Sequence, residues 1–590
     1  MKLTMKHLKL EALAEAVFTF FSNPLLYNEL NLNKYRVRQV VTVLEKNFMF
    51  CKFQPVTLLC WVLGVAVILG FSGACSPEYH KADADGEVYK IIDSKWQDDF
   101  GLKTNYTVSD YNDPASPNDV EIAEMIPESR IINLQKAVEI ATKFNRDYQS
   151  QKESLYLAAL DLTLTRHQYA RQWFGTIDGT YTDNKSNGDD VELTTSGGVD
   201  QRFLLLDGVL FNIGIAVDWT RFLTGDPRTT LGSVLSGDMT VPLLGAGAGK
   251  VARENLTQAE RSVLYRIRTF NRYRQMFVVD IISDYYRVLQ QKNSVTIAEA
   301  SYKRLIDSTN QLKMEVKVGQ RAPSDADEAM QDLLRAENNL VTIQQRYEQL
   351  LDSFKIRLSL PTDANIVLDQ NELTALEAIG ISQPEYTEAE AIEMALARRL
   401  DLANTINALE DSARKLELAA EGLGVQLNLT GSANVSSTEE TKVSRLEFHR
   451  GIYNLGFAAD LPLDRKAERN AYREALISME QRQRSYDNES ENVKLDVRQA
   501  YRDLAETGET YRIQKRGLEL AQRRVEEQKL LLEYGRGTIR LLLETNDSLV
   551  RAQNDLADAL VSHTIAKMSF FRDVGILQVK PDGMWEQRVQ

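Results

Sequence analysis

The chain has 590 residues, a formal net charge of −14 and a mean hydropathy of −0.33. The negative charge argues against nucleic-acid binding, and the hydropathy argues against a protein built from many membrane-spanning helices. The five histidines are scattered, which gives little support for a histidine metal site. Because neither a phosphate loop nor a nucleophile–base motif occurs, we expect no enzyme activity, no cofactor and no metal.

Residues 1–74 have the features of an export segment. The apolar stretch 57–71 follows Lys52 and is followed by small residues, which is the layout of a secretory signal. The sequence FSGAC resembles a bacterial lipobox and predicts an N-terminal lipid on Cys75; an ordinary signal peptide or an uncleaved anchor is the alternative. Residues 1–48 are long and mixed in charge for such a signal, so Met49 is a candidate for the true start.

Cysteine positions and charge distribution characterise the chain beyond the export segment. All three cysteines lie at or before Cys75, so we expect no disulfide framework in the rest of the chain. Residues 76–130 hold 13 acidic and 5 basic residues and show weak periodicity. We therefore expect residues 75–130 to be an acidic tether with little regular structure.

An internal twofold repeat organises the remaining chain. Ala137 matches Ala391 at an offset of 254 residues, whereas Gly319 matches Gly535 at an offset of 216. The smaller second offset means that the first half carries roughly 35 extra residues between its first helix and its long helix. The repeat predicts domains at 131–361 and 387–577, joined by a linker at 362–386 and followed by a tail at 578–590.

Each half contains a strand-like segment with a period of two. In the first half, residues 209–219 alternate between apolar and polar, and residues 173–181 are a candidate partner. In the second half, residues 425–435 and 453–461 alternate in the same way. We expect one pair of long strands within 173–241 and another within 424–462. A soluble sandwich is the alternative, although isolated strand pairs would leave open edges.

Long helices come after the strands in both halves. Residues 253–317 and 465–534 contain no proline and have apolar residues at helical spacing. Each predicted helix ends in a glycine-containing turn, at 317–328 or 533–544, and a shorter return helix comes next. The apolar steps of three and four predict that these helices pack as antiparallel coiled coils.

Together these features resemble TolC-type outer-membrane efflux and secretion channels over about residues 131–577. The pairs Tyr286/Leu289 and Tyr501/Leu504, and Pro242 and Pro462 at the strand ends, support the resemblance. It implies an α+β, mostly α fold with four strands per protomer. Three protomers would close a twelve-stranded outer-membrane β-barrel, and the long helices would form a second, helical barrel across the periplasm.

The resemblance also assigns roles to the two glycine turns, which it places at the periplasmic tip. It implies adaptor docking at six residues: Val318, Gly319, Arg321, Asp325, Gly535 and Arg536. Candidates for a constriction are Arg540, Leu541 and Glu544. The position equivalent to Asp325 is Leu541, which departs from the family's carboxylate ring. A solvated turn is the alternative role for the arginines.

The leading functional hypothesis is a passive exit duct of a tripartite efflux or type I secretion system. Its implied partners are two further copies of the chain in a homotrimer, a periplasmic adaptor, an inner-membrane pump and outer-membrane lipid, with no nucleic acid. The implied location is the outer membrane, by lipid anchor, with extension into the periplasm. The alternative hypothesis is a lipid-anchored periplasmic coiled-coil scaffold without a pore. Neither hypothesis identifies the cargo.

Overall fold

The computed structural model describes residues 76–103, 105–108, 126–184, 190–222, 229–244, 248–381, 386–437, 445–461, 463–534, 536–580 and 585–587. Contacts divide the chain into two units, Met1–Asp83 and Ala84–Gln590. Of the first unit only residues 76–83 are described, at the start of helix α5 (Pro77–Lys95). The expected export segment, Met49 and Cys75 lie outside the described residues.

The expectation of an irregular tether at 75–130 is wrong for its first part. Helix α5 buries Val88, Ile91 and Ile92, and a short 3-10 helix, η1, comes next at Asp98–Phe100. The hydroxyl of Tyr156 donates to Asp85 at 2.7 Å, and Arg274 donates to the backbone carbonyl of Leu102 at 2.8 Å. The apolar spacing of three and four is confined to the last two turns of α5, so the acidic residues around it hide the helical pattern.

Helices account for most of the second unit. The first half contains α7 (Leu134–Phe144), α8 (Arg146–Gln168), α9 (Ala248–Lys317) and α10 (Pro323–Arg357). The second half contains α12 (Glu388–Arg398), α13 (Leu400–Glu421), α14 (Lys466–Glu533) and α15 (Ile539–Val574). At 1.5 Å per residue, α9 and α14 are each about 100 Å long.

Short elements join and extend the two halves. Strand β1 (Ile131–Ile132) pairs in parallel with β6 (Val367–Leu368), and helix α11 (Asn371–Ile379) comes after β6. The segment expected as a plain linker therefore contains a strand and a helix. Near the C-terminus, β9 (Leu577–Val579) pairs with β10 (Trp585–Gln587), so the expected tail also contains regular structure.

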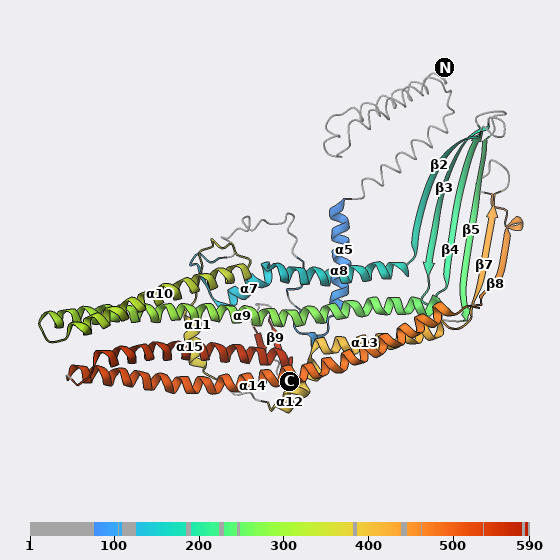
Figure 1. Cartoon of the computed structure of the whole chain (residues 1–590). Helices are drawn as coiled ribbons and strands as arrows, with labels where there is room; N and C mark the ends of the chain where they lie inside the picture. The colour runs from blue at the N-terminus through green and yellow to red at the C-terminus, as the bar shows by residue number, and fades with distance from the viewer. Residues whose placement is uncertain are drawn as a thin grey trace, which may run out of the picture. The chain divides into compact units, whose positions relative to one another are not determined.

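Six long strands form one antiparallel sheet, drawn at one end of α8 and α9 in Figure 1. Their order is that of the chain: β2 (Gln172–Asn184), β3 (Asp190–Leu204), β4 (Leu210–Phe222), β5 (Thr229–Leu244), β7 (Gln426–Ser436) and β8 (Ile452–Asp460). The short 3-10 helix η2 (Phe448–Arg450) precedes β8.

The expectation of four strands per protomer, and of one strand pair within 173–241, is therefore wrong. The first half contributes four strands, because β3 and β4 lie between the two strands that correspond to β7 and β8. This hairpin accounts for the roughly 35 extra residues of the first half. Glycines and short polar residues fill much of β3, so its alternation is weak in the sequence.

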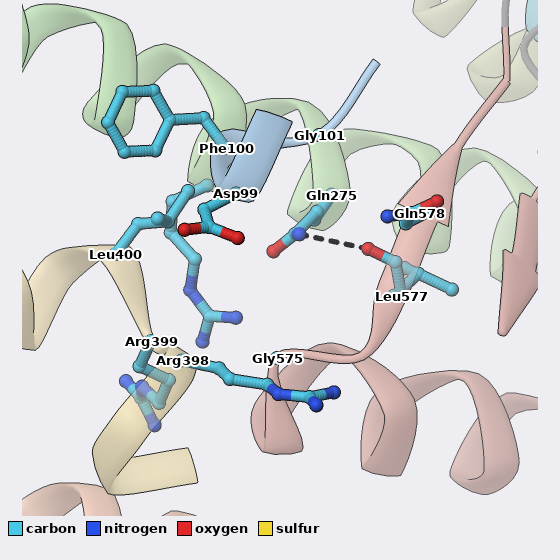
Figure 2. A pocket seen from close by; sticks show the side chains of 11 residues that line it. Asp99, Phe100, Gly101, Gln275, Arg398, Arg399, Leu400, Gly575, Leu577 and Gln578 are labelled. Carbon is cyan, nitrogen blue, oxygen red and sulfur yellow. Dashed lines mark hydrogen bonds between the residues drawn. The ribbon is translucent and has the colours of Figure 1, made fainter. Parts of the chain in front are cut away.

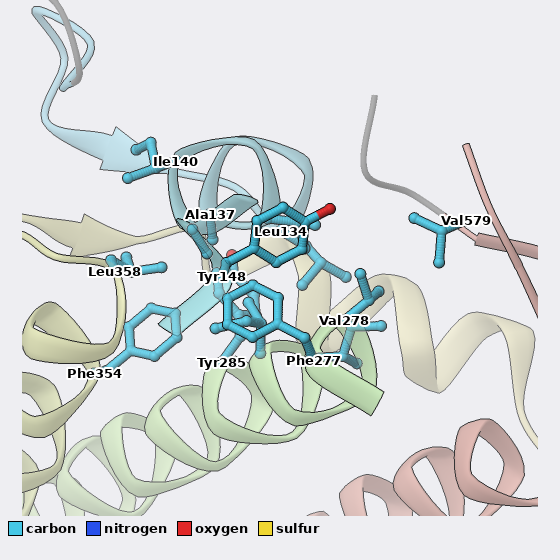
Figure 3. Packing of buried hydrophobic residues seen from close by; sticks show 14 of the residues in the cluster. Leu134, Ala137, Ile140, Tyr148, Phe277, Val278, Tyr285, Phe354, Leu358 and Val579 are labelled. Atoms are coloured by element: carbon cyan, nitrogen blue, oxygen red, sulfur yellow. The ribbon is translucent and has the colours of Figure 1, made fainter. Parts of the chain in front are cut away.

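The main core lies where the helices of the first half meet (Figure 3). Tyr148 of α8 and Phe277 of α9 are buried with ring centroids 5.1 Å apart. Tyr285 of α9 packs edge-on against Phe354 of α10, and its hydroxyl donates to the carbonyl of Ile132 at 3.1 Å. Aromatic side chains thus join three helices and bury large apolar surfaces.

A partly buried ionic network joins the helices of the second half to α9. Arg399, between α12 and α13, is 6% exposed and donates to Asp401 at 2.7 Å and to Asp496 of α14 at 2.8 Å. Arg272 of α9 pairs with Asp401 at 3.6 Å and with Asp573 of α15 at 3.2 Å. Burial raises the pKa of Asp401, whereas hydrogen bonds from Arg399 and the positive charge of Arg272 lower it. The lowering effects together are larger, so the pKa lies below its usual value.

We expect Asp401→Asn to lower the stability by about 2–3 kcal/mol at pH 7, because it removes a hydrogen-bonded partner of a buried cation. The pKa of Asp401 in the folded protein is below its value of about 3.9 in the unfolded chain. Ionised Asp401 therefore stabilises the folded protein fully above about pH 3.9, and this stabilisation is lost as the pH falls through the folded-state pKa. Thermal unfolding at pH 7 and at pH 3 should therefore show a difference between the proteins that narrows in acid.

The matched control is Glu491→Gln, which removes an exposed partner of Lys494 on α14 and should change the unfolding temperature little. An Asp401→Asn effect equal to that control, or one that does not change with pH, would contradict the prediction.

Candidate functional site

The six-stranded sheet has one apolar face and one polar face. Residues that pair across the strands share parity, apart from one register shift between Pro242 and Leu244, so odd-numbered residues lie on one face and even-numbered residues on the other. The odd-numbered face, called here the apolar face, carries Trp173, Ile177, Tyr181, Leu193, Val199, Phe203, Phe211, Ile213, Ile215, Val217, Trp219, Leu231, Leu235, Met239, Val241, Leu427, Leu429, Val435, Tyr453, Leu455 and Phe457.

The apolar face is not covered by other described parts of the protomer at many positions. Ile177 is 79% exposed, Leu455 is 75% exposed and Phe457 is 71% exposed. Among the described side chains its polar interruptions, Thr195, Gln201 and Ser233, are few. An apolar surface of this extent marks a region that contacts another apolar phase or another protein.

The even-numbered face, called here the polar face, carries the charges. Every charged strand residue whose side chain the structure describes lies on it: Asp178, Glu192, Asp200, Arg202, Asp218, Asp238 and Asp460. Threonine, serine and asparagine fill much of the rest, and Thr194 and Thr220 contact each other through their hydroxyls at 3.3 Å. The polar face is therefore hydrophilic and mainly acidic.

The first helical turn, between α9 and α10, is closed by backbone hydrogen bonds. Gly319 has a φ of +75°, and the amide of Gln320 donates to the carbonyl of Glu315 at 2.9 Å, so the last carbonyls of α9 are satisfied. Arg321 turns back to Glu315 at 3.3 Å, while Val318 is exposed. Asp325 lies in the first turn of α10, where its charge favours the helix dipole.

The second helical turn, between α14 and α15, shows Arg536, Arg540, Leu541 and Glu544 as exposed residues. Gly535 lies outside the described residues. Thr538 accepts a hydrogen bond from the amide of Leu541 at 3.4 Å, which caps α15.

The two turns pack together through a small apolar cluster, and an exposed ion pair lies beside it. Leu305, Leu312 and Ala329 from the first hairpin pack with Ile539 and Leu543 from the second. Arg540 also reaches Glu328 of α10 at 3.9 Å. Sequence reasoning missed Glu328, because this contact joins two hairpins more than 200 residues apart and has no signal in either local pattern.

A cavity of about 20 Å³, shown in Figure 2, lies between η1, the α12–α13 junction and β9, where Gln275 donates to the carbonyl of Leu577 at 2.9 Å. That volume holds about one water molecule. Within the described ranges, no cluster of three His, Cys, Asp or Glu residues could hold a metal ion. None of the described helices has the length and apolarity needed to cross a bilayer.

Comparisons with known proteins identify the fold. Residues 391–570 match the family model described as outer membrane efflux protein. The structure is similar to the CmeC outer-membrane channel of Campylobacter jejuni, with a TM-score of 0.55 and 13% identity over 84% of this chain and 93% of that chain.

Two further solved structures are similar, each with a TM-score of 0.54. One is VceC of Vibrio cholerae, at 12% identity over 75% of this chain and 96% of that chain. The other is the open state of MtrE of Neisseria gonorrhoeae, at 12% identity over 75% of this chain and 88% of that chain. Among curated protein sequences, none matches. The predicted resemblance to TolC-type outer-membrane channels is confirmed, and the structural matches show that the chain shares their mostly helical α+β fold.

The first turn provides a test of backbone geometry. We expect Gly319→Val to destabilise the turn by about 1–2 kcal/mol, because a branched residue is strained at positive φ. A Cβ at this position would meet no atom within 4 Å, so crowding does not contribute. Hydrogen exchange of the amides of residues 318–322 should speed up in this variant. Gly319→Asn is the control, since asparagine tolerates this conformation, and equal exchange in the two variants would contradict the prediction.

Proposed function

We propose that the protein is the outer-membrane exit channel of a tripartite efflux or type I secretion system. The observation that carries the proposal is the two-faced sheet joined directly to helices of about 100 Å. An apolar face toward lipid and a polar face toward water is the pattern of a transmembrane β-barrel. Its strands of 9 to 16 residues suffice to cross a bilayer when tilted.

Aromatic residues near both ends of the apolar face support a membrane setting. Tyr181 and Trp219 lie toward the strand ends far from the helices, and Trp173, Phe211 and Phe457 lie toward the helices. Aromatic residues at both interfaces are typical of outer-membrane barrels. The alternative function, a periplasmic scaffold without a pore, gives no physical reason for an apolar face with aromatic residues near both ends of its strands.

In this proposal the chain works as a homotrimer that conducts passively. A lipid on Cys75 anchors it in the outer membrane, and an inner-membrane pump supplies the energy through a periplasmic adaptor. The two helical turns form the periplasmic tip, where Val318, Gly319, Arg321, Asp325, Gly535 and Arg536 engage the adaptor. Arg540, Leu541 and Glu544 narrow the tip, and the Arg540–Glu328 pair contributes to holding the two hairpins together there.

The first experiment tests the channel itself. Full-length protein purified from outer membranes should form a trimer that dissociates only on heating, and should give single-channel currents in planar bilayers. Mass spectrometry of the same material should show a diacylated or triacylated N-terminal peptide starting at Cys75. A monomer without conductance would favour the scaffold and overturn the proposed channel, and an unmodified Cys75 would overturn the lipid anchor alone.

The second experiment tests the tip. We expect Arg321→Glu and Arg536→Glu to reduce co-purification with the adaptor and to lower export at least several-fold, because each reverses a positive charge at the tip. Trimer yield should be unchanged. Arg482→Glu, an exposed position on α14 far from the turn, is the matched control. Normal export in both tip variants would contradict the docking role.

A further inference from the structure

The two edges of the six-stranded sheet are β2 and β8. Neither has a strand partner on its outer side among the described residues. In a hydrocarbon medium each unpaired backbone group costs several kcal/mol, so a lipid-exposed sheet cannot keep open edges. The edges therefore need a partner that offers backbone groups at the same spacing.

We propose that β8 of one protomer pairs with β2 of the next copy, so that three copies close an eighteen-stranded barrel. The inference rests on the trimer of the proposed function. All five neighbouring pairs in the sheet are antiparallel, so β2 and β8 run in opposite directions. Their pairing between copies continues the antiparallel pattern around the whole barrel, with an even number of strands.

The hairpin formed by β3 and β4 is an integral part of this wall. β4 pairs in continuous register with both β3 and β5, from Leu210 to Arg221. Phe203 and Phe211 stack on the apolar face with centroids 4.9 Å apart. The hairpin thus has the same two-faced pattern as the strands beside it, which a loop extending into water would not need.

Its helix-side turn is also built against the start of the long helix α9. The amide of Leu205 donates to the carbonyl of Val209 at 2.9 Å, and Gly208 has a φ of +79°. Asp207 pairs with Arg253 of α9, and a Cβ at Gly249 would overlap the backbone of Asp207. The turn and the first residues of α9 therefore fit closely together.

An eighteen-stranded barrel changes the class of solute that can leave. Barrel diameter grows roughly in proportion to strand number, so the lumen is about 1.5 times as wide as that of a twelve-stranded barrel. Among the side chains that the structure describes, six acidic residues and one arginine line the polar face of each protomer. The exit therefore suits bulky neutral or cationic solutes and disfavours anions.

The first test asks whether β4 lies in the barrel wall. Single cysteines at Ile215 and Asp218, on opposite faces of β4, are labelled in outer membranes with a membrane-impermeant maleimide. The parent chain is the blank. We expect the Asp218→Cys variant to label at least tenfold faster than Ile215→Cys. Equal labelling of a trimer that still conducts would overturn the eighteen-stranded barrel and leave the proposed function standing, whereas loss of trimer and conductance in the parent would overturn the proposed function.

The second test asks which edges pair. Asn454→Cys on β8 is combined in turn with cysteines at Gln172, Thr176 and Asp178 on the polar face of β2. At least one pair should give an oxidised product containing two or three chains. Asn454→Cys with Ile177→Cys, which face opposite sides, is the control and should not cross-link. Absence of any intermolecular product from the three pairs would contradict the pairing of β8 with β2.

The third test measures width. Deleting residues 190–222 removes β3 and β4, and residues 185–189 and 223–228 then join β2 to β5. Because paired residues share parity throughout this part of the sheet, β2 can pair with β5 while each strand keeps its apolar side chains on the same face. Neutral polymers of graded size, added from the outer side of the bilayer, should enter the parent barrel at a larger size than they enter the deletion variant. An identical size limit would overturn the wider lumen; if the deletion variant does not assemble, the labelling and cross-linking results decide.

Discussion

Backbone hydrogen bonding along the sheet edges is the constraint on which the rest of the molecule depends. In the proposed outer-membrane channel the apolar face lies against lipid, and there the outer strands cannot rely on water for their unpaired N–H and C=O groups. Helix α8 precedes β2 and helix α14 follows β8, in each case with only a few residues between helix and strand. In the proposed trimer, closing the sheet between copies therefore also places the helices of those copies around a common axis, so that the strand edges determine the arrangement of the helices.

A second requirement is that helices of about 70 residues stay aligned far from the sheet. Apolar contacts alone give little positional specificity to helices whose surfaces are largely polar. The network of Arg399, Asp401, Asp496 and Arg272 supplies fixed hydrogen-bond directions at one level, where α12 ends and α13 begins. The cluster around Ile539 and Leu543 provides a second point of attachment at the turns. Between these points, the contact between helices is a repeated apolar pattern that tolerates small shifts.

Much of the helical architecture could be predicted from the sequence because its signals are local. Uninterrupted apolar spacing predicts α9 and α14, and Gly319 predicts the turn between α9 and α10. The strand count could not be read from alternation alone, since β3 contains Gly197 and Gly198 where apolar residues would be expected; the shift in repeat offset was the better clue. Helix α5 escaped detection because only its last turns are apolar. At the two helical turns, the Arg540–Glu328 pair depends on tertiary contact and has no trace in either turn's own sequence.

The pairing of β5 with β7 has a consequence for biogenesis. Val234 pairs with Ser436 and Met239 with Gly431, so this ladder joins residues about 200 positions apart. A chain exported from its N-terminus exposes one side of β5 until the second half has emerged. Loop-closure entropy makes such long-range pairing slow, and an unpaired strand in the meantime is prone to aggregation. In the proposed outer-membrane channel, β5 thus stays without its β7 partner for the time taken to export most of the helical segment between the two strands.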